Sequence, residues 1–153
     1  MKKAGFTIIE MLVVMTVLGI LATAAMPLIE LTTKRNKERD LRQSLTEIRH
    51  AIDAYKQAYD TGHITKTSQA SGYPPNLATL VEGVEDITAE GKKLYFLRRI
   101  PKDPFSSDAA PENAWGLRSY ESAPDHPKEG EDVFDIYSKS DAVGMNGIPY
   151  RQW

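Results

Sequence analysis

The chain opens with an apolar segment and then changes to a helical alternation of apolar and polar positions. Between Phe6 and Leu28, Glu10 is the only charged residue. As an α-helix this stretch would span roughly 34 Å, enough to cross a hydrocarbon core of about 30 Å. The pattern therefore predicts a membrane-spanning helix over residues 6–29 and makes the lipid bilayer an expected partner.

Glu10 is the first candidate functional residue. An ionised carboxylate in hydrocarbon costs about 2.5 kcal/mol or more, so it is rare there without a partner. A secretory signal peptide is the competing interpretation, since Ala22-Thr23-Ala24 imitates a small-x-small cleavage site. Gly19 and Pro27 interrupt the apolar run, and because proline removes a backbone hydrogen bond, we expect a helix kink there.

A second helical pattern follows the membrane segment. Apolar residues recur at alternating steps of four and three: Leu41, Leu45, Ile48, Ile52, Tyr55 and Tyr59. They form one stripe on a helix of period 3.6, so we expect an amphipathic helix over residues 30–61 that ends at Gly62. The rest of the chain is the obvious cover for this stripe, and a coiled coil is the alternative. The charged stretch from Thr32 to Asp40 is expected to be largely solvated.

Residues 62–153 are predicted to form a small globular head. Asn76 is suited to cap a short helix. The segment Trp115–Glu121 alternates weakly, as an exposed strand does, and Asp132–Ser138 is the strongest predicted strand. Antiparallel strands packed on the helical stripe would make an α+β fold with a long amino-terminal helix.

The composition of the chain narrows the classes of function that it can have. The 153 residues carry a net charge of −2 and no cysteine. The charge gives no reason to expect nucleic-acid binding, which usually shows as a basic patch, and the lack of cysteine excludes disulfides and thiolate metal sites. His50, His63 and His126 are scattered and match no catalytic spacing. We therefore expect no catalytic residue and no enzyme.

The first ten residues carry a specific combination. The run Lys2-Lys3-Ala4-Gly5-Phe6-Thr7-Ile8-Ile9-Glu10 resembles the leader and mature amino terminus of type IV pilins and of type II secretion pseudopilins. The resemblance implies that residues 1–5 are a leader, that a prepilin peptidase cuts between Gly5 and Phe6, and that Phe6 is then N-methylated. It also implies that Glu10 directs assembly by pairing with the amine of Phe6 on a neighbouring subunit, since the two charges offset each other in lipid.

Later segments resemble the major pseudopilins of type II secretion, in order along the chain. They are Tyr73–Pro75, Leu97–Phe105 and Asp135–Ser138. The resemblance implies a subunit of a homo-oligomeric helical filament, anchored in the bacterial inner membrane with its head in the periplasm. Minor pseudopilins and an inner-membrane assembly platform are its implied partners. Two alternatives stay open: a type IV pilin for adhesion, motility or DNA uptake, and a membrane-tethered periplasmic binding module with an acidic head.

Major pseudopilins typically bind calcium in the loop after the last strand. Ser138 and Asp141 would be the first ligands here, with Asn146 as a further oxygen donor. Calcium favours about six to eight oxygens, commonly with several carboxylates, and no second acid follows Asp141. We therefore expect no cofactor to be required. A weak calcium site is one alternative, and a loop held by Tyr150 and Trp153 in the core is the other.

Overall fold

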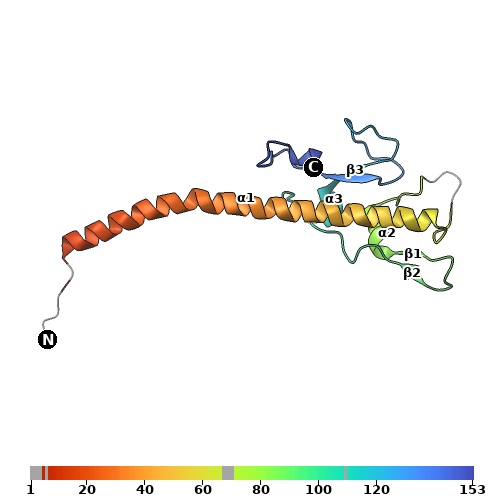
Figure 1. Cartoon of the computed structure of the whole chain (residues 1–153), viewed down its shortest axis with the longest axis horizontal. Coiled ribbons are helices and arrows are strands. Elements are labelled where there is room, and N and C mark those ends of the chain that lie inside the picture. Colours follow the sequence, from red (N-terminus) through yellow and green to blue (C-terminus); the bar gives the residue numbers. More distant parts are fainter. Residues whose placement is uncertain (1–4, 6, 67–70, 109) are drawn as a thin grey trace. The chain divides into compact units, whose positions relative to one another are not determined.

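Ile8–Asp60 forms one helix, α1, in the computed structural model of the chain (Figure 1). The structure describes residues 5, 7–66, 71–108 and 110–153, and within α1 it leaves out the side chains at 24, 25 and 27. The chain divides into two compact units, residues 1–36 and 37–153. The predicted membrane segment belongs to the first unit and the predicted apolar stripe to the second.

Large apolar side chains are exposed along the described part of α1 that lies in the first unit. Their exposed fractions run from 85% at Ile8 to 49% at Leu31. The hydroxyls of Thr16 and Thr23 each donate to a carbonyl of their own helix at 2.8 Å, which is how polar groups are satisfied where lipid excludes water. By length and composition, α1 can cross a membrane.

The helical assignment of α1 runs through Gly19 and Pro27 without a break. A Cβ atom added at Gly19 would meet nothing within 4 Å, so no close packing inside the chain requires glycine at this position. The side chain of Pro27 is not among those described. The kink expected at these two residues stays a prediction.

The predicted stripe of α1 is the centre of the core of the second unit. Its buried members are Leu41, Leu45, Ile48, Ile52 and Tyr55. Tyr59 is only partly buried and packs against the core from its edge. The rest of the second unit therefore covers the stripe, as predicted, and the coiled-coil alternative is not needed to bury it.

Both helix boundaries predicted from capping residues are confirmed. Gly62 follows the end of α1 with φ of 82°, a left-handed conformation that glycine adopts without strain. The amide of His63 donates back to a helix carbonyl at 2.9 Å and closes the last turn. The second helix, α2 (Leu77–Glu82), is capped by Asn76, whose side chain accepts the amide of Thr79 at 2.9 Å.

Four short strands form two antiparallel pairs. The first pair is β1 (Val84–Glu85) with β2 (Lys93–Leu94), and the second is β3 (Trp115–Arg118) with β4 (Asp135–Ser138). The register of the second pair sets Trp115 opposite Ser138. The strand β4 confirms the strongest prediction. The β1–β2 pair was not predicted from the sequence, because two-residue strands show no periodicity.

The second unit places these elements around α1. A short helix, α3 (Pro111–Ala114), leads into β3, and a 3₁₀ helix, η1 (Tyr150–Gln152), lies near the carboxyl end. Figure 1 shows α2, β1 and β2 on one side of α1, with β3 and the carboxyl-terminal segment on the other. A long helix with small antiparallel sheets is the predicted α+β, pilin-like fold.

The prediction that Trp115–Glu121 forms an exposed strand is wrong in one respect. A strand is present, but Trp115 is only 1% exposed. Its indole nitrogen donates to the carbonyl of Pro101 at 2.9 Å, so the polar end of a large ring is satisfied inside the core. Gly116 beside it is also buried, and a Cβ there would overlap the ring of Tyr137 on β4. The strand is therefore part of the core.

Candidate assembly site

Thr7 and Glu10 cap the amino end of α1 reciprocally. The amide of Thr7 donates to the Glu10 Oε2 atom at 2.8 Å, and the amide of Glu10 donates to the Thr7 hydroxyl oxygen at 3.3 Å. The Thr7 hydroxyl also donates to the same carboxylate oxygen at 2.7 Å. This arrangement is a capping box, which satisfies backbone donors that the first helical turn leaves without partners.

The capping box determines where the carboxylate of Glu10 lies. Glu10 is the third residue of α1, within the first turn, where the helix dipole favours a negative charge. Both hydrogen bonds from Thr7 reach Oε2, so the side chain is drawn back toward the residue that follows Phe6. This role of Thr7 was not predicted from the sequence, although the Thr-x-x-Glu spacing is the signature of a capping box.

The predicted cleavage point lies just before this site. Phe6, the predicted methylation site, is outside the described residues. Gly5 is exposed, and a Cβ added to it would meet nothing within 4 Å. Packing within the chain therefore does not require glycine at this position.

The side chains of the two predicted calcium ligands, Ser138 and Asp141, contact different partners. Ser138 is fully buried and its hydroxyl donates to Asp103 Oδ2 at 2.5 Å. The side chain of Asp141 is 90% exposed, and its Oδ1 atom lies 3.4 Å from a guanidinium nitrogen of Arg151. No group of three or more His, Asp or Glu side chains in the described part of the chain is arranged to hold a metal ion. In the structure Ser138 and Asp141 therefore have separate side-chain partners, and calcium binding by these two residues stays a prediction.

Comparison with known proteins identifies the family. Residues 1–26 match the family described as "Prokaryotic N-terminal methylation motif". The chain is similar to the type II secretion system core protein G of Klebsiella pneumoniae, with 30% identity over 118 residues that cover 70% of this chain and 72% of the relative. The corresponding protein of Vibrio cholerae is 31% identical over 115 residues, covering 70% and 68%. The chain belongs to the type II secretion system core protein G family. No solved structure gives a significant match.

Similarity to core protein G extends beyond the amino-terminal motif. The Escherichia coli relative is 28% identical over 109 residues, which cover 70% of each chain. A match over 70% of the chain is longer than residues 1–60, so it includes part of the second unit beyond α1. The predicted membership of the pseudopilin family is therefore confirmed.

Glu38 is a buried polar residue of this core protein G chain whose burial was not predicted from the sequence. It was included in the charged stretch expected to be solvated, yet only 7% of it is exposed. Its Oε1 atom accepts the amide of Met145 at 2.7 Å and the hydroxyl of Tyr150 at 3.0 Å. The spacing of the stripe carried a signal, because Glu38 lies three residues before Leu41 and continues its period by one turn.

Proposed function

We propose that this chain is the repeating structural subunit of a periplasmic pseudopilus that drives protein export through type II secretion. The observation that carries the proposal is the similarity to core protein G at 30% identity or more over most of both chains. The methylation motif at residues 1–26 supports it. In this role the chain assembles and is not itself a catalyst.

The amino-terminal segment would hold the subunit before assembly. The exposed apolar surface between Ile8 and Leu31 suits the inner membrane, with the head in the periplasm. Prepilin peptidase would remove residues 1–5 and methylate Phe6. An assembly platform in the inner membrane would extract the subunit, and its energy would come from an ATPase in the cytoplasm.

Glu10 would guide each subunit into the filament. Cleavage after Gly5 creates a cationic amine at Phe6, and a carboxylate on a neighbouring subunit can pair with it. Each charge alone is costly in lipid, and removing one partner leaves the other unpaired. The Thr7–Glu10 capping box supports this role because it holds the carboxylate in the first turn of α1 before a neighbour arrives.

Gene deletion in the source bacterium, followed by complementation, tests the proposal. Deletion should leave exported proteins in the periplasm, and the wild-type gene should restore their appearance in the medium. Glu10→Ala should remain in the membrane fraction and fail to restore secretion. Glu30→Ala is the matched control, because it removes another exposed carboxylate of α1, and it should restore secretion.

Two results would contradict the proposal. Unchanged secretion after deletion, together with loss of long surface fibres, would identify a type IV pilin instead. Full secretion with Glu10→Ala would refute the charge-pairing step. Fractionation and immunoblotting of each variant separate a failure of assembly from a failure to reach the membrane.

A further inference from the structure

We propose that the C-terminal loop (residues 139–149) is held by the carboxylate of Glu38 on α1 and does not depend on calcium. The resemblance to major pseudopilins implies a calcium site in this loop. The residues present do not fit one, and the structure shows a different anchor in the same place. The inference goes beyond the proposed function, which stands or falls independently of it.

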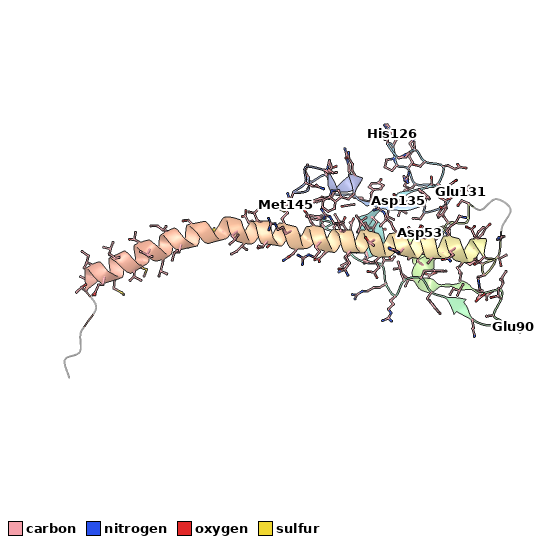
Figure 2. The ribbon with its side chains drawn as sticks, viewed as in Figure 1. Asp53, Glu90, His126, Glu131, Asp135 and Met145 are labelled. Carbon is pink, nitrogen blue, oxygen red and sulfur yellow. The ribbon has the colours of Figure 1, made fainter. Side chains whose placement is uncertain are left out.

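The loop and Tyr150, which directly follows it, present hydrogen-bond donors to Glu38. The amide of Met145, labelled in Figure 2, and the hydroxyl of Tyr150 both donate to Oε1. Calcium instead needs oxygen lone pairs directed at one point. A buried carboxylate that gathers N–H and O–H groups is the opposite arrangement, and hydrogen bonds to a charged group are the stronger kind. Glu38 therefore connects α1 to the loop through hydrogen bonds.

The oxygens that calcium would need already have other partners. Ser138 donates its hydroxyl to Asp103 inside the core. Asn146 Oδ1 accepts the amide of Ile148 at 3.1 Å within the loop. Arg151 places a guanidinium beside Asp141, so a positive charge already lies where the only acid of the loop would meet a cation. A calcium ion would have to compete with each of these partners.

The loop also closes on itself. The amide of Gly144 donates to the carbonyl of Ile148 at 2.9 Å, and the amide of Gly147 donates to Gly144 at 3.0 Å. Gly147 has φ of 80°, which suits the turn between them. Val143 and Pro149 form an antiparallel bridge. The loop therefore has a defined backbone without a metal to organise it.

Aromatic packing fixes the base of the loop. The ring of Tyr150 stacks on Phe105 with centroids 4.1 Å apart and meets the edge of Trp153 at 5.0 Å. The guanidinium of Arg42 on α1 lies 4.5 Å from the Trp153 ring centroid, a cation–π contact. Glu38 and Arg42, on successive turns of α1, thus both contact the carboxyl-terminal segment.

The test is hydrogen exchange of the Met145 amide together with thermal unfolding of the full-length protein in detergent. Each is measured with calcium chloride and with a calcium chelator. We expect the same exchange rate and the same melting midpoint in both conditions. Glu38→Gln should speed exchange of Met145 roughly tenfold or more, because it replaces a charged acceptor with a weaker, neutral one. Asp40→Asn, an exposed acid on the same helix, should leave exchange unchanged.

Either of two results would overturn the inference. One is a lower melting midpoint with chelator that calcium restores and that Asp141→Asn abolishes. The other is an exchange rate of the Met145 amide in Glu38→Gln that equals the wild-type rate.

If Glu38→Gln does not fold, Tyr150→Phe serves as a second variant, because it removes one of the two donors to Glu38 and retains the ring. It should unfold at a lower temperature than the wild type, by the same margin with calcium and with chelator. A calcium-dependent margin would also refute the anchor, and neither result bears on secretion.

Discussion

Three buried polar residues connect segments of the second unit that are far apart in the sequence. Glu38, Asp103 and Ser138 are each less than a tenth exposed. Ser138 pairs with Asp103, and Glu38 accepts two donors from the carboxyl-terminal segment. In the described part of the chain, no buried side-chain nitrogen or oxygen lacks a hydrogen-bond partner. Since an unpaired buried group costs about 1–3 kcal/mol, these pairs favour one arrangement of the segments that they join.

Tyr150 should make stability fall at alkaline pH. Burial, followed by the hydrogen bond to the Glu38 carboxylate, raises the pKa of Tyr150 from 10.0 to about 12. The folded protein then keeps a proton that the unfolded chain has lost. The stability that this residue contributes is therefore complete below pH 10 and is lost as the pH rises from 10 to about 12. Denaturant unfolding across this range measures it.

Tyr150→Phe is the control for that prediction. Burial also raises the pKa of Tyr55, so the wild type has more than one source of alkaline instability. Subtracting the Tyr150→Phe curve from the wild-type curve isolates Tyr150. A difference that does not vary across the alkaline range would contradict the predicted proton linkage.

Helix α1 is the element on which the head is built. Its buried stripe supplies the core, and Arg49 on the same helix reaches the β3–β4 pair. The Arg49 Nε atom donates to Asp135, labelled in Figure 2, at 2.8 Å. Its Nη2 atom donates to the backbone oxygens of Ile136 and Trp153 at 3.1 and 2.8 Å. One helix therefore positions both the sheet and the carboxyl-terminal segment.

Ile48→Ala should destabilise the head strongly. Ile48 is fully buried at the middle of the stripe, and truncating such a side chain typically costs about 2–5 kcal/mol. Thr46→Ala is the matched control on an exposed position of the same helix, with an expected change within about 0.5 kcal/mol. Urea unfolding of both full-length variants in detergent gives the comparison. Equal midpoints would show that the head does not depend on the stripe.

Periodic elements were predictable, and short ones were not. The stripe of α1 and the strand β4 repeat a pattern over several residues, so local sequence predicts them. The pair β1–β2 has strands of two residues. The burial of Trp115 depends on Pro101, which accepts its indole hydrogen bond from another loop. Such placements depend on tertiary contacts that no local pattern contains.

At the scale of the whole molecule, the two units differ in what they bury. The second unit has a buried apolar core, whereas the described large apolar side chains of the first unit, from Ile8 to Leu31, are exposed. Apolar surface of this extent is typical of contact with lipid or with other subunits. Under the function proposed above, this surface would contact lipid first and neighbouring subunits afterwards.

Processing of the leader should change the mass of the whole chain. We expect mass spectrometry of filaments to find a chain that begins at Phe6 and carries one methyl group. Gly5→Leu should retain residues 1–5. Gly19→Ala is the control, because a Cβ at either glycine meets nothing within 4 Å, and it should be processed normally. Wild-type filaments that retain Met1 would refute cleavage.

Four local properties of this protein follow from its sequence alone: an apolar span with one acid, an amphipathic helix, the glycine at its end and the amino-terminal motif. Each of these depends on residues within a few turns of one another. Tertiary structure alone decided that Glu38 is buried against Tyr150 and that Ser138 pairs with Asp103. The reason is physical. Hydrophobic periodicity depends only on residues close together in the sequence. A hydrogen bond between residues far apart in the sequence forms only when packing brings the two side chains together.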